Sequence, residues 1–363
     1  MPNLLQKAFK EPGGIGPLKE YIIPQKPLFK IIFSKASKRA ISLPPLFLVL
    51  TLLASALVAS YSYAKNPDTP GTVRILAPRS TASTPLLILA EKDPIEGTHI
   101  VVELFINHPA AMARLITGEA DLLFTGTSAG WENRLNGGPL VMVNTGVWGV
   151  SYLVSRDGKI RSFADLAGKR ISLPFPGAPL DFQTRYLLSR SGLDPDKDLS
   201  IRYAPFTQTV PMLLSGTIDA APLPEPLATS VIMNSDLLRA IDYKKAWAEL
   251  SETDGEDSRY SPQVSLFTTR QKAGDLKETI VKITGEWKQA SAWVRDHSTE
   301  AARLTETQID VPRDVLKTAI ENTLFFIPSF EENLDLVQDY YSKVRKYLPG
   351  KREELDRDFF FIP

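Results

Sequence analysis

Apolar positions in this chain recur with two periods that alternate along the sequence. Between residues 73 and 148, short apolar or alternating runs typical of strands are separated by stretches with helical spacing. The expected strands are Val73–Pro78, His99–Phe105, Ala120–Phe124 and Leu140–Trp148. The helical stretches are Pro85–Ala90, Pro109–Gly118 and Gly126–Leu135. Because connections of this length are too long for hairpins, the pattern predicts a largely parallel sheet.

The run Tyr152–Ser155 is expected to be a strand that leaves this unit, and a short helix starts at Ser162, before a second β/α series. Further strands are expected at Arg170–Pro174, Ser200–Ala204 and Asp219–Leu223, with helices at Asp181–Ser191 and Val210–Ser215. The apolar run Gln263–Thr268 is a strand that leads back. The helices expected after it are Lys277–His297, Pro312–Thr323 and Glu331–Tyr347.

These patterns predict an α/β protein with two lobes, two crossing segments between them and a helical ending. We expect residues 73–151 and 268–348 to form lobe 1 and residues 152–267 to form lobe 2. At 363 residues the chain is long enough for two domains that each bury a core.

An apolar run at residues 46–58 follows a basic stretch and precedes small residues at 62–64. This is the layout of a secretory signal peptide, so residues 46–64 are predicted to contain the apolar region and cleavage site of an export signal. The alternative is a retained membrane anchor, since residues 46–64 are just long enough to cross a bilayer. Residues 1–45 are expected to be a disordered extension, and the predicted location is the periplasm.

Charge and cysteine content exclude several classes of function. The formal net charge is zero, but residues 1–64 hold eight basic and two acidic residues, which leaves 34 basic and 40 acidic residues beyond them. A mildly acidic body without a basic stripe argues against nucleic-acid binding. The chain has no cysteine, and none of its three histidines is spaced from another as metal ligands are. No metal and no cofactor is predicted.

Candidate binding residues follow the ends of the expected strands. In open α/β sheets, ligands bind in the crevice outside the carboxyl ends of the strands, where helix N-termini offer free N–H groups. Hydroxyl side chains there could instead cap helices, and the aromatic ones could belong to the core. The candidates are Arg79, Ser80, Thr81, Ser83, Thr127, Ser128, Trp148, Phe175, Gly177 and Glu225.

Glu225 differs from the other candidates because Pro224 and Pro226 enclose it. With no helix of its own expected beside it, Glu225 is predicted to face the cleft as a fixed acceptor. Asp181 and Phe182, in contrast, are expected to have structural roles, the first in a helix's first turn and the second in the core.

The phrases Gly118–Asp121 and Gly216–Asp219 share the pattern Gly-x-x-Asp. We expect each glycine to end a helix in the left-handed conformation and each aspartate to begin the next strand. No ligand role is assigned to either phrase.

The segments Phe163–Pro174 and Leu213–Ala220 resemble phrases of the periplasmic solute-binding proteins of ABC importers, in particular the nitrate/sulfonate/taurine and thiamine-precursor-binding group. The resemblance covers roughly residues 73–339. It implies a type II periplasmic-binding-protein fold and a non-catalytic monomer. In that role the chain captures a small polar organic solute, such as a sulfonate, taurine or a pyrimidine, and delivers it to an ABC permease and ATPase in the inner membrane.

Two other functions are compatible with the same fold. One is a membrane-anchored ligand-sensing domain that retains residues 46–64. The other is an enzyme, but the thiamine-precursor synthases that resemble these binders carry a cysteine-rich motif, which this chain lacks.

Overall fold

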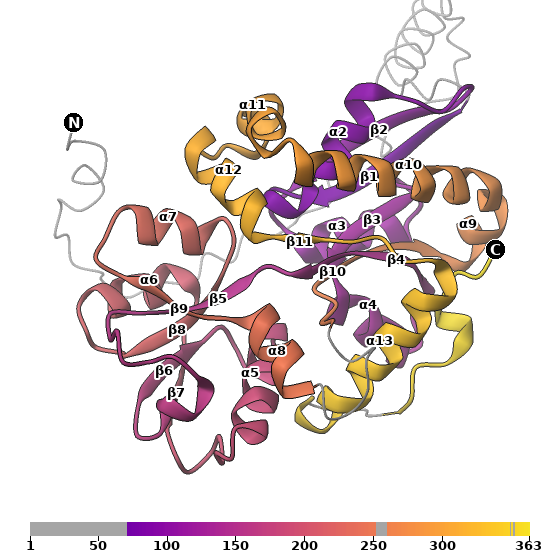
Figure 1. Ribbon diagram of the computed structural model, residues 1–363. Helices are drawn as coiled ribbons and strands as arrows, with labels where there is room; N and C mark the ends of the chain where they lie inside the picture. Colours follow the sequence, from indigo (N-terminus) through magenta and orange to yellow (C-terminus); the bar gives the residue numbers. More distant parts are fainter. Residues whose placement is uncertain (1–70, 252–259, 349, 351–352) are drawn as a thin grey trace, which may run out of the picture. The chain divides into compact units, whose positions relative to one another are not determined.

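The computed structural model of the chain describes residues 71–251, 260–348, 350 and 353–363, which contain two β-sheets (Figure 1). Sheet A has the strand order β11–β4–β10–β3–β1–β2 and sheet B the order β7–β6–β8–β5–β9. We call sheet A with its helices lobe 1 and sheet B with its helices lobe 2. The predicted export signal and extension, residues 1–64, lie outside the described residues.

Lobe 1 contains elements from two separate parts of the chain. Its strands are β1 (Thr72–Pro78), β2 (His99–Phe105), β3 (Leu122–Gly126), β4 (Leu140–Gly149), β10 (Val264–Thr269) and β11 (Leu324–Phe325). Its helices in the first part are η2 (Thr81–Ser83), α2 (Thr84–Lys92), α3 (His108–Ile116) and α4 (Thr127–Leu135). Those in the second part are α9 (Arg270–Asp275), α10 (Lys277–Asp296), α11 (Ser298–Ile309), α12 (Arg313–Asn322), α13 (Phe330–Val344), η6 (Arg345–Tyr347) and η7 (Arg357–Phe359).

Lobe 2 is built from the intervening chain. Its strands are β5 (Ser151–Ser155), β6 (Arg170–Leu173), β7 (Ser200–Tyr203), β8 (Ala220–Pro224) and β9 (Leu238–Asp242). Its helices are η3 (Phe163–Leu166), α5 (Pro179–Arg190), α6 (Phe206–Leu214), α7 (Leu227–Met233) and α8 (Tyr243–Ser251).

The two-lobed α/β fold is confirmed. Strands β1 to β4, for which a largely parallel sheet was expected, run in one direction, but each sheet also contains antiparallel strands. Strand β10 runs antiparallel to both β3 and β4 in sheet A. Strand β5 likewise runs antiparallel to β8 and β9 in sheet B. Both strands adjoin the crossings between the lobes, so each enters its sheet against the direction of the βα units around it. Because β10 belongs to sheet A, residues 264–267 lie there and not in lobe 2, where the predicted boundary put them.

Sequence patterns missed six α-helices and β-strands, namely α7, β9, α8, α9, α11 and β11. The first three lie in succession between residues 227 and 251. Helix α7 has only seven residues and β9 only five, so neither repeats an apolar period often enough to be recognised. This missed stretch matters because β9 and α8 supply residues to the contacts described below.

The two Gly-x-x-Asp phrases form the same structure in both lobes. Gly118 and Gly216 have φ angles of 84° and 72°, so both end their helices in the left-handed region as predicted. The carboxylate of Asp121 accepts from the N–H of Arg74 at 2.8 Å, and that of Asp219 accepts from the N–H of Arg170 at 2.7 Å. Each aspartate thereby fixes the start of the neighbouring strand, which is a structural role.

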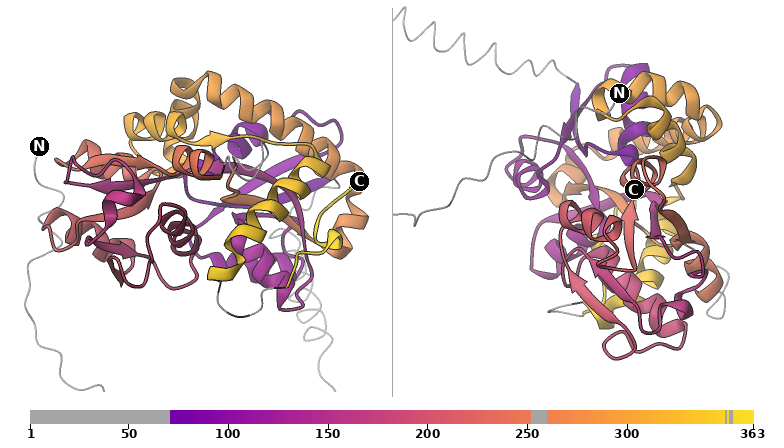
Figure 2. Two further views of the ribbon diagram at one scale, coloured as in Figure 1. Left: turned by 60° about the horizontal axis from the view of Figure 1, so that its bottom comes forward. Right: turned by 90° about the vertical axis from the view of Figure 1, so that its left-hand side faces the viewer.

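Sheet A is covered by helices on both faces (Figure 2). Along β1, Val73, Ile75 and Ala77 face a core shared with α2 and α10, whereas Leu76 faces a core shared with α4 and α13. Among the described helices, none is both long and apolar enough to cross a bilayer.

One hydrophobic core extends through both lobes. Its centre is a set of rings that we call the aromatic seam: Trp131 of α4, Phe182 and Tyr186 of α5, Trp247 of α8, and Tyr340 of α13. Ring centroids lie 5.8 Å apart for Trp131–Phe182 and 4.7 Å apart for both Tyr186–Trp247 and Trp247–Tyr340. All five side chains are buried. The lobes are therefore packed directly against each other along these helices.

Candidate functional site

Strand register brings the carboxyl ends of several strands to the crossing between the lobes. In sheet A, Val264 pairs with both Gly126 and Val147, so the ends of β3 and β4 lie at one edge. In sheet B, Pro224 at the end of β8 pairs with Ser151, the first residue of β5. We call the residues that follow these strand ends, together with those after β1 and β6, the strand-end region.

The loop after β1 places its predicted residues at different depths. Arg79 is exposed, with its guanidinium 3.9 Å from Asp310, and Ser80 is half-buried. Thr81 and Ser83 are fully buried, and the Ser83 hydroxyl donates to the carbonyl of Pro78 at 2.6 Å. The hydroxyls of Thr81 and Thr84, in contrast, are buried without a hydrogen-bond partner among the described residues. Unpaired buried hydroxyls are uncommon because each one costs its desolvation energy.

Thr127 and Ser128 begin helix α4, and both are buried. No side chain caps this helix, so the capping alternative does not hold for Thr127 and Ser128. The Thr127 hydroxyl lies 2.8 Å from that of Ser265, which in turn lies 2.9 Å from that of Thr145. Ser265 and Thr145 were not among the predicted residues, although polar residues inside otherwise apolar strands were a signal for them.

Trp148 is buried at the end of β4, next to the crossing segment. Its indole N–H donates to the carbonyl of Phe326 at 2.8 Å. Its ring contacts those of Tyr260 and Phe326, with centroids 5.8 Å and 6.1 Å apart. Trp148 therefore belongs to an aromatic cluster, and its own ring is nearly covered.

Phe175 and Gly177 lie in the loop between β6 and α5. Phe175 is 60% exposed, so it is a large apolar side chain that no described residue covers fully. Gly177 is buried, with φ of 78°, and its N–H donates to the carboxylate of Asp181 at 2.7 Å. That bond occupies the N–H that Gly177 was expected to offer a ligand. Asp181 and Phe182 have the structural roles predicted for them, and Asp181 also accepts from Arg185 at 2.9 Å.

Glu225 is held by residues of both lobes. Its carboxylate accepts from the N–H and hydroxyl of Thr229, at 3.0 Å and 2.9 Å, from Arg239 at 3.0 Å and from the amide of Asn322 at 3.0 Å. We call these four residues the Glu225 cluster. The expectation that Glu225 has no helix beside it is wrong, because it accepts from Thr229 in the first turn of the missed helix α7. Asn322 is the last residue of α12, so the cluster also joins lobe 2 to lobe 1.

A second polar contact between the lobes lies beside the Glu225 cluster. Lys244 donates to the hydroxyl of Tyr152 at 2.5 Å and to the carbonyl of Asn322 at 2.6 Å. Burial lowers the pKa of Lys244 and raises that of Tyr152. Gly149 of the crossing segment permits this approach, because a Cβ there would lie 1.9 Å from Cγ of Lys244.

Two glutamines that the sequence analysis did not single out meet where the lobes join. Gln183 of α5 donates to the hydroxyl of Ser261 at 3.1 Å, and Gln263 donates to the amide oxygen of Gln183 at 3.3 Å. We call these three residues the amide cluster, and all of them are buried. The carbonyl of Gln263 also accepts from the N–H of Thr127 at 3.0 Å, which links the amide cluster to the start of α4. These side chains supply neutral donors and acceptors from both lobes.

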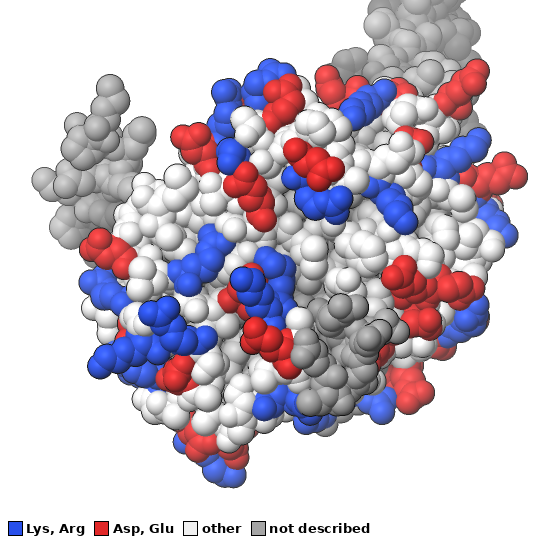
Figure 3. Space-filling view, viewed as in Figure 1, with Lys and Arg blue, Asp and Glu red and all other residues white. Residues whose placement is uncertain are grey.

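The structure thus brings together only part of the predicted set. Thr127 and Trp148 are linked through the amide cluster, since Ser261 donates to the carbonyl of Trp148 at 3.3 Å. Glu225 belongs to its own cluster, and Arg79 and Phe175 are exposed. Two pockets lined by described residues, of about 530 Å³ and 420 Å³, include none of the ten predicted residues. On the face shown in Figure 3, basic and acidic side chains are interspersed.

Comparison with known proteins gives a family match for part of the chain. Residues 88–252 match the model of the periplasmic substrate-binding protein of phosphonate ABC transporters. The nitrate/nitrite binding protein NrtA of Synechococcus elongatus is 24% identical over 173 residues, which are 46% of this chain and 36% of that protein. The chain therefore aligns with only about a third of that relative's length.

Solved structures share the fold over most of both chains. An ABC transporter structure from Parabacteroides distasonis has a TM-score of 0.67 at 18% identity, covering 80% of this chain and 98% of that one. The periplasmic aliphatic sulphonate binding protein SsuA of Escherichia coli has a TM-score of 0.61 at 16% identity, covering 79% and 93%.

Proposed function

The chain belongs to the solute-binding proteins of ABC importers, a non-catalytic family with the type II periplasmic-binding-protein fold, and from this premise we propose that it binds a small polar organic solute where its two lobes meet. The solute class that we propose is sulfonate-, taurine- or pyrimidine-like. After export, the chain would deliver the solute to an ABC permease and ATPase in the inner membrane.

The amide cluster is the observation that supports this site most directly. Gln183 comes from lobe 2 and Gln263 from the strand that returns to lobe 1, and their side chains are hydrogen-bonded across the junction. A solute bound there would exchange these amide contacts for its own, and so would touch both lobes. The unpaired hydroxyl of Thr81 and the uncapped start of α4 add donors in the same strand-end region.

The character of these donors favours a polar solute of low charge density. Amides and hydroxyls are neutral, and the buried carboxylate of Glu225 already has four donors. The cationic candidate Arg79 is exposed, with its guanidinium 3.9 Å from the carboxylate of Asp310. An organic molecule with several acceptor oxygens matches neutral donors better than a bare inorganic ion does.

A thermal-shift screen of the purified chain tests this proposal. The panel contains taurine, alkanesulfonates, nitrate, pyrimidines and small carboxylates. A true ligand at about 100 times its dissociation constant stabilises the folded state by roughly 2.7 kcal/mol. Gln183→Ala should abolish that shift, whereas Gln208→Ala, on the exposed face of α6, should retain it. A shift that is equal in the two variants would remove the amide cluster from the site.

Export and delivery need a separate test, because the alternative is an anchored ligand-sensing domain. We propose that the chain is cleaved after Ala64, so mass spectrometry of the exported protein should find Lys65 at its N-terminus. Recovery of an uncleaved chain in the membrane fraction would support the anchored alternative instead. Turnover of a bound compound by the purified chain would contradict the binding function and favour an enzyme.

A further inference from the structure

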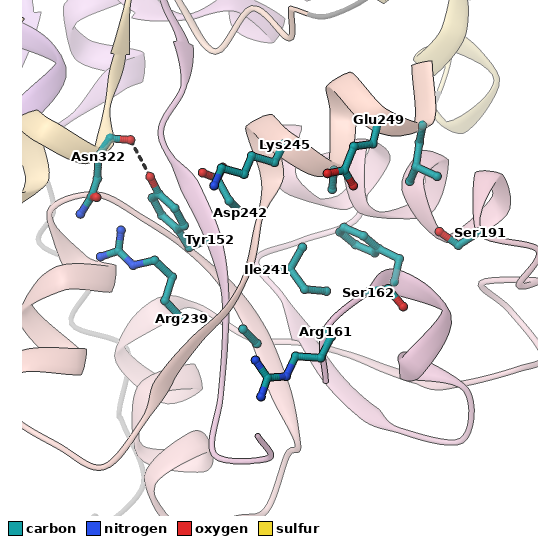
Figure 4. A pocket seen from close by; sticks show the side chains of 14 residues that line it. Tyr152, Arg161, Ser162, Ser191, Arg239, Ile241, Asp242, Lys245, Glu249 and Asn322 are labelled. Carbon is teal, nitrogen blue, oxygen red and sulfur yellow. Dashed lines mark hydrogen bonds between the residues drawn. The ribbon is translucent and has the colours of Figure 1, made fainter. Parts of the chain in front are cut away.

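A pocket of about 530 Å³ opens on lobe 2 beside β9, the edge strand of sheet B (Figure 4). The turn before η3 and helix α8 form its other walls. None of the strand-end candidates or amide-cluster residues lines it, but Arg239 and Asn322 of the Glu225 cluster do, and Asn322 belongs to lobe 1.

Three charged side chains in this pocket have no ion-pair partner within the described part of the chain. They are Arg161 before η3, and Lys245 and Glu249 on α8. The other charged groups that line the pocket are engaged, since Arg239 pairs with Glu225 at 3.0 Å and Asp242 with Lys244 at 3.4 Å. The pocket therefore presents two unpaired cations and one unpaired anion.

Lys245 and Glu249 both lie on α8 and do not form an ion pair with each other. They lie four residues apart on α8, where opposite charges usually approach each other closely. In this order, with the lysine toward the helix N-terminus, the direct pair is the less favourable one. Both side chains line the pocket instead and leave their charges available to a molecule between them.

The rest of the lining combines polar side chains, among them Ser162, Ser191 and Asn322, with an apolar part. Phe163 and Ala246 are buried, and Ile241 of β9 and Leu250 of α8 complete an apolar surface next to the charged groups. A surface of this kind suits a short branched aliphatic group.

We infer that this pocket is a second small-molecule site, and that it binds a free amino acid with an apolar side chain. The carboxylate of such a zwitterion matches Arg161 and Lys245, its ammonium matches Glu249, and its side chain covers the apolar surface. A simple anion would leave the charge of Glu249 uncompensated, and a simple cation would leave two positive charges uncompensated.

Equilibrium dialysis of the full chain with radiolabelled compounds tests this inference. The probes are L-leucine, isocaproate, which lacks the amine, and isoamylamine, which lacks the carboxylate. We expect leucine to bind one per chain and each analogue to bind at least about tenfold more weakly. Arg161→Ala and Glu249→Gln should each weaken leucine binding by about tenfold. Arg202→Ala removes an exposed cation from the same lobe outside the pocket and should leave binding unchanged.

Three outcomes would overturn the inference. The first is no saturable binding of leucine at millimolar concentration. The second is equal affinity for leucine and isocaproate, which would show that Glu249 recognises nothing. The third is loss of leucine binding in Gln183→Ala but not in Arg161→Ala, which would place leucine in the strand-end region. Because Gln183 and Arg161 report on different sites, failure here and failure of the proposed function are distinguishable.

Discussion

The side-chain amide of Asn322 donates a hydrogen bond to the carboxylate of Glu225, with 3.0 Å between Nδ2 and Oε1. Asn322 ends α12 in lobe 1, and Glu225 follows β8 in lobe 2. This bond joins the lobes through a carboxylate that also accepts from Arg239 and from the first turn of α7. Glu225 is thus a structural residue of the lobe junction, whatever further role it has toward a solute.

Replacing Glu225 tests this structural role. Glu225→Gln keeps the shape of the side chain but removes the charge opposite Arg239, so a half-buried guanidinium loses its ion-pair partner and keeps only its bond to the Thr229 hydroxyl and its contact with the Tyr152 ring. We expect the free energy of unfolding to fall by about 2–3 kcal/mol, measured by urea denaturation. Asp236→Asn, an exposed carboxylate in the same lobe, is the control and should change stability by less than about 0.5 kcal/mol.

A double-mutant cycle isolates the bond between the lobes. The variants Asn322→Ala, Glu225→Ala and their combination should give a coupling energy of about 0.5–1.5 kcal/mol. Additive effects within error would mean that the Asn322–Glu225 bond contributes nothing in solution.

Two phenylalanines seven positions apart differ in how much their rings contribute to stability. Phe182→Ala removes a ring from the aromatic seam and should lower the free energy of unfolding by about 3–5 kcal/mol. Phe175→Ala removes a ring that is 60% exposed and should change stability by less than about 1 kcal/mol. If both variants lose similar stability, the seam does not join the lobes as described.

Removing an unpaired buried hydroxyl should have the opposite effect on stability from removing a hydrogen-bonded one. Thr81→Val replaces a buried hydroxyl that has no partner among the described residues, so the ligand-free chain should keep or gain stability. Thr127→Val breaks the bond to Ser265 and should lower stability by about 1–3 kcal/mol. Thermal denaturation of both variants measures the contrast, and a destabilised Thr81→Val would reveal a partner for that hydroxyl.

His108 should make stability depend on pH. It lines the pocket between α3 and α4, where partial desolvation lowers its pKa below the usual value near 6.5. As the pH falls below that value, the unfolded chain takes up a proton that the folded chain refuses, so stability decreases toward acid and rises with pH.

His108→Gln should flatten this part of the curve of unfolding free energy against pH. The amide of glutamine can still bond the hydroxyl of Thr125, which lies 2.9 Å from the imidazole nitrogen. His297→Gln removes another histidine, one stacked on Trp293, and serves as the control. An unchanged slope in His108→Gln would assign the pH dependence to other groups.

Most strands and helices of this protein were predicted because the patterns that specify them involve residues close together in the sequence. Strand and helix periods, and the glycines at 118 and 216, depend on residues a few positions apart. The direction of a strand within its sheet depends on distant residues instead. Strand β10 pairs with β3 and β4, which lie more than 100 residues away along the chain. No short-range pattern carries that information.

The candidate site was predicted less well for the same reason. Thr127 and Trp148 were both selected because they lie at strand ends, but their connection runs through Gln183 and Gln263, which nothing local distinguishes. Glu225 was misjudged because its partner helix α7 is short and its partner Asn322 lies 97 positions away. Long-range hydrogen bonds decide which polar residues are free, and a single sequence does not show them.

The aromatic seam has a consequence for how the chain unfolds. Lobes that meet through a wet, polar interface can melt one after the other, whereas here Trp131, Phe182 and Tyr340 belong to a core that both lobes complete. Neither lobe can lose its structure without exposing rings that stabilise the other. Heating should therefore produce one cooperative transition, with equal calorimetric and van't Hoff enthalpies, rather than two.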